Sequence, residues 1–253
     1  QRDIFIYALS ILTGVVIART LGPELLGVWV LLSLVSSYAE GFGRPKTDVA
    51  SVYLLGSKKA RPEEILFSMT FFAVLSSSLV VILFLWQIDL IQGLLFQKLD
   101  INYRKELIFI ILIIPLEFLL HNYSYFYIGL EKVAIFNRIR VLQAILNFIV
   151  ICGLIFFLEF EIWALILARA ISIFIPLIYS YINTERSNWM SLSSRWNSAL
   201  TIEILRYAFN FYIIGVIGHI NRLTVKTIAA LFFTSSQLAF YNQGESSGRF
   251  LNV

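Results

Sequence analysis

The stretch at residues 65–86 constrains the fold most, because it runs for 22 positions without a charged residue. An α-helix needs about 20 predominantly apolar residues to cross the hydrocarbon layer of a bilayer. A buried strand is usually only about 4–8 residues long, so this stretch is too long to be one. The stretch therefore predicts a membrane-spanning helix.

Comparable apolar runs recur along the chain, which is 58% hydrophobic and only 14% charged, with a mean hydropathy of +0.80. Soluble domains carry about 25% charged residues, so the bilayer is the natural solvent for this much Leu, Ile and Phe. We therefore expect an all-α, polytopic bundle of membrane-spanning helices. Besides residues 65–86, the expected spans are residues 4–18, 25–41, 107–130, 141–158, 162–182, a seventh from 204 to beyond 220, and an eighth that begins near Gln237.

The segment at residues 183–200 divides the chain, because it is rich in Ser, Asn and Trp and lies between two groups of apolar runs. We expect a six-helix amino-terminal lobe at residues 1–182, a cytoplasmic linker at residues 183–200, and an incomplete second lobe at residues 201–253. The first residue is Gln1 and the eighth run stops at Val253, so we expect the sequence to be part of a longer chain.

Basic residues are distributed unevenly between the segments that connect the expected spans. If the amino terminus lies inside, twelve basic residues fall in inside segments and only four, Arg19, Lys98, Arg104 and Lys105, in outside segments. This positive-inside bias favours that orientation and accounts for the basic pI without a nucleic-acid partner. The twelve are Arg2, Arg44, Lys46, Lys58, Lys59, Arg61, Lys132, Arg138, Arg140, Arg186, Arg195 and Arg206.

The inside segment at residues 43–64 is the longest connection between the early spans. Its centre, residues 49–55, suggests a short helix at the inner surface, where Lys58, Lys59 and Arg61 would face anionic headgroups. A solvated loop without regular structure is the alternative.

The segment ARTLGPELLGVW at residues 18–29 places a turn signal, Gly22-Pro23, between two apolar runs. It resembles the first extracellular turn of the polysaccharide transporter family, the Wzx-like flippases of the multidrug/oligosaccharidyl-lipid/polysaccharide exporter superfamily. In that family an apolar helix is followed by a pattern close to A-R-x-L-G-P-x-x-x-G-x-aromatic. The resemblance implies two six-helix lobes related by an axis along the membrane normal.

The same resemblance implies a function for the chain. Wzx-like proteins move an isoprenoid (undecaprenyl) pyrophosphate-linked oligosaccharide across the bacterial cytoplasmic (inner) membrane by alternating access. The transported repeat units serve the biosynthesis of O-antigen of lipopolysaccharide, of capsule or of exopolysaccharide. We therefore expect a flippase, and not an enzyme, in this membrane.

A second copy of the turn is expected where the second lobe begins. An offset of 212 residues places residues 233–241 on residues 21–29, so that Ala239 meets Gly27. The second copy has Thr-Ser in place of Gly-Pro, and Val225 stands where the family often has an acidic residue.

Two titratable residues lie in the fourth expected span. A charged side chain at the bilayer centre costs about 2.5–3.5 kcal/mol on insertion scales, so such residues face a cavity or a partner. Glu117 and His121 are four residues apart and share a helical face with Ser124 and Tyr125. This pair predicts coupling of transport to a proton or cation gradient. A structural hydrogen bond to a neighbouring helix is the alternative.

Three basic residues within the later runs are candidates for holding a substrate phosphate. Arg169 lies in the sixth expected span, and its guanidinium matches phosphate oxygens bidentately. A partner such as Glu117 or a backbone carbonyl is the alternative. Arg222 and Lys226 are four apart in the seventh expected span, which favours a wet cavity or a bound anion between them. The alternative is a helix end from which both reach the outer surface.

Together these residues suggest how the expected cargo is held. Arg169, Arg222 and Lys226 bind the pyrophosphate, Asn122 and Tyr125 contact sugars, and the lipid tail stays in the bilayer. The expected partners are the lipid-linked oligosaccharide, membrane lipids and a polysaccharide polymerase. No cofactor, metal or catalytic residue is expected, since the sequence has no Walker A lysine motif, nucleophile elbow or Cys/His metal spacing.

Two other functions stay open. A multidrug exporter of the same superfamily would need a cavity dominated by acidic and aromatic residues, and the basic residues of the seventh span argue against it. A membrane polysaccharide polymerase or glycosyltransferase would need a large outer loop with paired acidic or Arg residues. The longest outer loop, residues 87–106, holds Asp89, Asp100 and Glu106 without a compact constellation.

Overall fold

The computed structural model describes residues 2–58, 60–99, 101–158, 160–186 and 197–250, and every regular element within these ranges is a helix. Six helical segments in them are long and apolar enough to cross a membrane. The chain is therefore an all-α, polytopic membrane helix bundle, as the sequence predicts. The elements are α1 (Arg2–Tyr38), the π-helical turn η1 (Ala39–Gly43), α2 (Thr47–Gly56), α3 (Pro62–Trp86), α4 (Ile88–Leu95), α5 (Arg104–Gly129), α6 (Val133–Leu158), α7 (Glu161–Arg186), α8 (Ser198–Phe232) and α9 (Ser235–Phe250).

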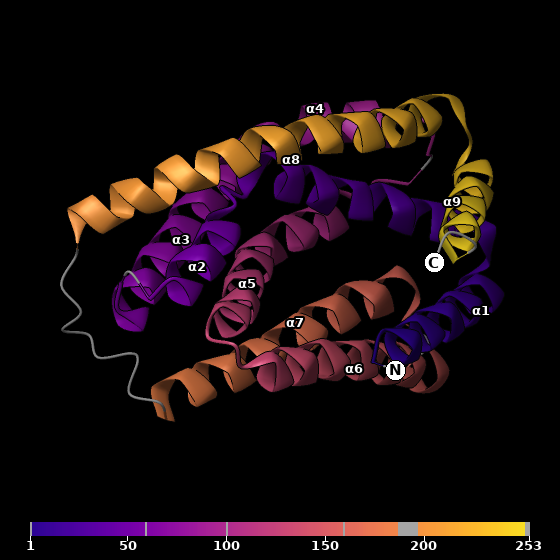
Figure 1. The fold of residues 1–253 in the computed structure, drawn as a ribbon. Coiled ribbons are helices and arrows are strands. Elements are labelled where there is room, and N and C mark those ends of the chain that lie inside the picture. The colour runs from indigo at the N-terminus through magenta and orange to yellow at the C-terminus, as the bar shows by residue number, and fades with distance from the viewer. Residues whose placement is uncertain (1, 59, 100, 159, 187–196, 251–253) are drawn as a thin grey trace.

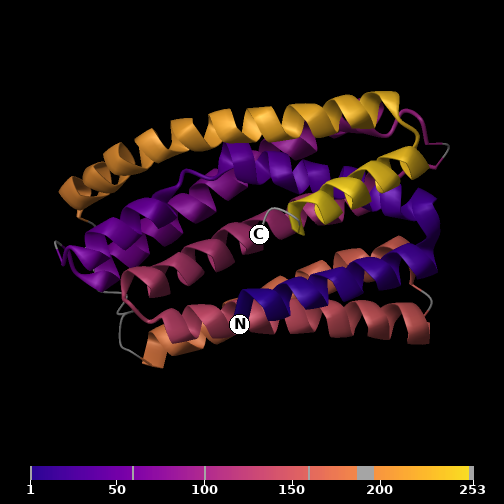
Figure 2. The same ribbon diagram turned by 45° about the vertical axis from the view of Figure 1, so that its right-hand side comes forward.

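Helix α1 consists of two helices joined at Gly22. Gly22 has φ 74° and ψ 172°, a conformation that glycine adopts without the steric cost of a side chain, and Pro23 begins the second helix. Figures 1 and 2 show the indigo chain leaving the amino terminus, reaching one end of the bundle and turning back. The expected spans at residues 4–18 and 25–41 are thus the first arm (residues 2–21) and second arm (residues 23–38) of a helical hairpin.

The second arm does not lead into a surface loop. It continues through η1, leaves helical geometry at residues 44–46 and enters α2 after Lys46, whose φ of 53° is left-handed. Ala50 and Leu54 on α2 are fully buried, and the helix packs against α3, α5 and α8. The expectation of a helix at residues 49–55 is confirmed. Its apolar face is covered by three helices, and its place on or near the inner surface stays a prediction. We call residues 39–46 the break.

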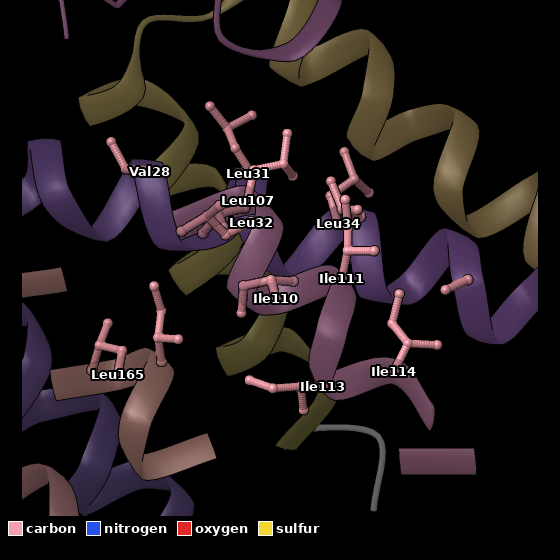
Figure 3. Packing of buried hydrophobic residues seen from close by; sticks show 14 of the residues in the cluster. Val28, Leu31, Leu32, Leu34, Leu107, Ile110, Ile111, Ile113, Ile114 and Leu165 are labelled. Carbon is pink, nitrogen blue, oxygen red and sulfur yellow. The ribbon is translucent and has the colours of Figure 1, made fainter. Parts of the chain in front are cut away.

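Two apolar cores hold the bundle together. In the first, apolar side chains of the second arm and of α5 belong to one buried cluster, among them Leu31, Leu32, Leu34, Leu107 and Ile111 (Figure 3). The second core surrounds α2 with side chains from α3, α5 and α8. The chain leaves the first core at the start of the break and joins the second core in α2, so the break lies where the chain crosses between the two cores.

The last two helices form a second hairpin against the first. Helix α8 runs along the second arm, the break and α2, and α9 turns back to pack against α1 (Figure 1). Gly27 lies at this contact, because a Cβ atom there would collide with the backbone of Ser235. The offset of 212 residues places Thr234 on Gly22, and the chain turns at both positions, which lie at the same end of the bundle (Figure 2).

Several helices extend beyond the expected spans. Helix α6 begins at Val133 and α8 at Ser198, so Arg138, Arg140 and Arg206, which we had assigned to connecting segments, are helical. Helix α7 continues to Arg186, and residues 187–196 of the expected linker lie outside the described residues. The boundary between two lobes and the orientation in the membrane stay predictions.

Candidate functional site

A polar cavity of about 510 Å³ lies among both arms of α1, the break, α5, α6 and α7. Its position in the bundle agrees with the expectation that charged residues inside these spans face a shared space. The charged and polar residues that line it are Glu40, Arg44, Glu117, His121, Ser124, Tyr125, Arg140, Gln143, Asn147, Arg169 and Ser172.

Helical periodicity explains why two of the cavity walls are polar. On α5, Glu117, His121 and Ser124 recur at spacings of four and three residues and therefore lie on one face. On α6, Arg140, Gln143 and Asn147 recur at spacings of three and four. Each stripe interrupts an otherwise apolar helix, and both stripes face the same cavity.

Arg169 on α7 pairs with Glu117 on α5. The Arg169 Nε donates to a Glu117 carboxylate oxygen at 2.5 Å, and the guanidinium carbon lies 6.0 Å from the ring centre of Trp29. A charge-assisted hydrogen bond and a cation–π contact therefore hold this guanidinium at the cavity wall. The alternative partner that the sequence suggested for Arg169 is the one the structure shows.

Arg44 at the break is a second arginine of the cavity. Its side chain is only 8% exposed and lies 3.4 Å from a Glu40 oxygen and 3.6 Å from an Asp48 oxygen. The Asp48 side chain, 2% exposed, also lies 3.5 Å from Nε2 of His121. His121 stacks at a tilt on Tyr125, with ring centres 4.7 Å apart. Glu117 and His121 thus share a face of α5 but have different partners.

Helix α8 covers the break from the other side. The hydroxyl of Tyr212 donates to the backbone carbonyl of Phe42 at 2.6 Å, which satisfies an acceptor freed by the irregular backbone. The Lys46 side chain lies against Gly215, where a Cβ atom would come within 2.9 Å of Lys46 Cε. Burial lowers the pKa of the Lys46 amine, and the Arg44 charge acts in the same direction. The break is therefore held in place by protein, as irregular backbone within a membrane bundle must be.

Three of the expected site residues lie elsewhere. Asn122 is buried and donates its amide to the backbone carbonyl of Met69 at 2.9 Å, so it faces α3. Lys226 contacts Asn242 at 3.3 Å and Glu245 at 3.1 Å, both on α9. Arg222 is exposed and lies outside the cavity lining. The structure brings Glu117, His121, Tyr125 and Arg169 together and leaves these three apart.

Sequence reasoning missed Arg44, Asp48 and Arg140. Arg140 was assigned to a loop because the apolar run begins at residue 141, although its spacing to Gln143 and Asn147 already indicated a polar helical face. No comparable signal marked Arg44 and Asp48, because their burial depends on the helices that pack around this segment. Arg140 forms no ion pair with any described residue.

An apolar cavity of about 490 Å³ lies on the opposite side of the break. It is lined by side chains of α1, α3, α4 and α8, among them Phe42 and Val80. Gly43 forms the wall between the two cavities, since a Cβ atom there would meet Val80 and the Phe118 ring that lines the polar cavity. The break therefore presents polar groups to one side and apolar groups to the other.

Comparison with known protein families, curated proteins and solved structures found no match. The fold and the long apolar helices define the chain as a multi-pass membrane protein. Within this class, the polar cavity sets the chemistry available. It is lined by three arginines and two glutamates, together with hydroxyl and carboxamide groups.

Proposed function

We propose that the chain belongs to a transporter that moves an isoprenoid pyrophosphate-linked oligosaccharide across a bacterial cytoplasmic membrane. The observation that carries this proposal is the composition of the polar cavity. Arginines outnumber carboxylates in its lining, and one arginine, Arg140, has no ion-pair partner among the described residues. Guanidinium groups bind phosphate oxygens through paired, charge-assisted hydrogen bonds. The resemblance of residues 18–29 to Wzx-like flippases supports the same cargo.

The remaining lining suits the other parts of such a molecule. Gln143, Asn147 and Ser172 offer the amide and hydroxyl groups that pair with sugar hydroxyls, and Tyr125 offers an aromatic face. The apolar cavity across Gly43 is adjacent to the polar one, so a lipid chain and a charged headgroup can lie side by side without burying charge in hydrocarbon.

The excess of positive charge argues against a multidrug exporter of organic cations, because the arginines that line the cavity would repel a cation. In our proposal Arg140 makes the first contact with the phosphate. The phosphate then replaces Glu117 as the partner of Arg169, and it replaces Glu40 as a partner of Arg44. Alternating access then exposes the cavity to the two membrane faces in turn.

Arg140→Gln, compared with Arg138→Gln, tests the proposal. Both residues are exposed on α6, but only Arg140 lines the cavity. Farnesyl pyrophosphate is titrated by calorimetry into the full protein in lipid nanodiscs. A hydrogen bond to a charged group is worth about 1.5–3 kcal/mol, so Arg140→Gln is expected to weaken binding about tenfold or more.

Arg138→Gln is expected to bind like the wild type. Equal affinities for all three proteins, or equal loss in both variants, would overturn the assignment of the cavity as the pyrophosphate site. Farnesol, which lacks the anion, is expected to show no difference among the three. Purified protein that joins sugar units without a partner would instead favour a membrane glycosyltransferase or polymerase.

A further inference from the structure

Both histidines of the chain lie against the break, although they are far apart in sequence and lie on different helices. His121 on α5 faces Asp48, which follows the break, and the ring of His219 on α8 covers Gly41. A Cβ atom on Gly41 would come within 2.9–3.1 Å of three His219 side-chain atoms. His219 therefore lies on the break and His121 faces the residue that follows it closely, and these are the two side chains whose ordinary pKa lies near neutrality.

The carboxylate of Asp48 lies between two potential cations at nearly equal distances. The same oxygen, Oδ2, is 3.5 Å from Nε2 of His121 and 3.6 Å from Nη1 of Arg44. Neither contact is short enough for a strong hydrogen bond. Asp48 Oδ1, Arg44 Nη1 and His121 Nε2 are all buried without a hydrogen-bond partner among the described residues. Such orphaned buried groups are costly, so the arrangement is poised to gain a partner.

We propose that Asp48 and His121 form a proton-binding site that sets the position of the break. A proton from water binds Nε2 of His121 and converts the neutral imidazole into an imidazolium beside the Asp48 carboxylate. No other bond is made or broken. With His121 neutral, Asp48 balances the charge of Arg44. With His121 protonated, the carboxylate is shared, and the hold of Asp48 on Arg44 weakens.

The other charged groups around His121 leave Asp48 as its acidic partner. On its own helix, Glu117 is paired with Arg169 of α7 at 2.5 Å. Helix α6 contributes only the cation Arg140 to the shared cavity, and residues 65–86 of α3 contain no charged side chain. The groups on or beside the break are Glu40, Arg44, Lys46 and, from α8, His219 with Arg222 close to it.

The break has the construction of an element that can move. It combines a π-helical turn with three residues, 44–46, that have no regular secondary structure, the last of which is the left-handed Lys46. Arg44, whose contact with Asp48 is weakened by proton binding while its contact with Glu40 stays, already lines the polar cavity. The sequence suggested Glu117 as the acid that pairs with His121, whereas in the structure the carboxylate near His121 Nε2 is that of Asp48. The inference requires no particular cargo.

Nuclear magnetic resonance can test the proton site directly, because a chain with two histidines gives two ring signals. Full protein labelled at the histidine Cε1 carbon is titrated with acid in nanodiscs, and His219→Gln assigns the signals. Asp48→Asn is expected to move the His121 titration midpoint to lower pH, because it removes the anion that favours the imidazolium. Arg44→Gln is expected to move the midpoint to higher pH, because it removes a competing cation.

Asp89→Asn serves as the matched control, since Asp89 is an exposed carboxylate paired with Arg104 at 2.6 Å. It is expected to leave the midpoint unchanged. Each variant must keep the helical circular dichroism spectrum and the His219 signal of the wild type. An unchanged His121 midpoint in folded Asp48→Asn would overturn the proton site.

Hydrogen exchange tests the link to the break. After correction for intrinsic rates, amides of residues 39–48 are expected to exchange faster below the His121 midpoint than above it. His121→Gln is expected to abolish this difference. The same pH dependence in His121→Gln would overturn the coupling. These measurements need no substrate, so their failure is distinguishable from failure of the transport proposal.

Discussion

At the scale of single residues, some polar groups in and beside the cavity could be recognised from the sequence and others could not. Glu117, His121 and Arg169 stand out in the sequence because each interrupts a long apolar run. Arg44 and Asp48 do not, because they lie in a segment that looks like a polar connection. Their burial depends on α8 and α5 covering that segment. A polar site residue could therefore be predicted only where the sequence already indicated the helix that carries it.

Lys46 allows a pH-dependent prediction. Burial lowers the pKa of its amine below the ordinary value of 10.5, which the unfolded chain retains. Between these two values the unfolded state binds more protons, so this group makes the folded state more stable as pH rises through that window. Below the window its destabilising effect is fully present. Lys46→Met is therefore expected to raise the melting temperature in detergent at pH 8, and the gain should shrink as pH approaches 10.5.

Lys98→Met is the control for this experiment, because Lys98 is exposed. Melting is followed by circular dichroism at several pH values. A gain at pH 8 that is equal in both variants would show that added hydrophobicity, and not burial of the Lys46 amine, is responsible.

At the scale of secondary-structure elements, the apolar runs located α3, α5, α6, α7 and α8 and misplaced several ends. Helix α9, at the eighth expected span, is not among the helices that are long and apolar enough to cross a membrane. Helices α6 and α8 begin earlier than predicted because polar residues that precede the apolar runs, such as Arg138 and Glu203, are helical as well. The second arm continues through η1 to Gly43, and α2 follows after residues 44–46 as a separate helix that packs on α3, α5 and α8. Hydropathy locates the apolar segments of the chain, whereas the position at which a helix ends also depends on the contacts of its polar residues.

The hairpin contact between α1 and α9 gives a prediction at this scale. Gly27→Val would place a side chain against the Ser235 backbone, whereas Gly14 on the first arm has open space around it. Overpacking costs about 1–3 kcal/mol, so Gly27→Val is expected to lower the free energy of unfolding by about that amount. Gly14→Val is expected to be neutral. Equal melting temperatures for the two variants in detergent would contradict the close approach of α9.

At the scale of the whole molecule, the bundle has two ends that the chain visits alternately. The turn at Gly22, the end of α6 and the end of α8 lie at one end, and the ends of α2, α5 and α7 lie at the other (Figure 2). This alternation is required of a chain that crosses a bilayer repeatedly. The distribution of basic residues predicts which end faces the cytoplasm.

Labelling of single cysteines tests the orientation. In a Cys152→Ser background, Gln97→Cys and Ser57→Cys place exposed thiols at opposite ends of the bundle. In intact cells, a membrane-impermeant maleimide is expected to label Gln97→Cys and to label Ser57→Cys only after permeabilisation. The reverse pattern would place the amino terminus outside.

The sequence by itself determined that this chain is a membrane helix bundle, where its long helices lie and where its first hairpin turns, because bilayer thickness and glycine geometry act locally along the chain. Only the tertiary structure decided which polar residues meet. It joined Arg169 to Glu117, placed Asp48 between Arg44 and His121, and directed Lys226 to α9 instead of the cavity. The physical reason is that a buried charge must find a partner, and that partner depends on which helices pack together.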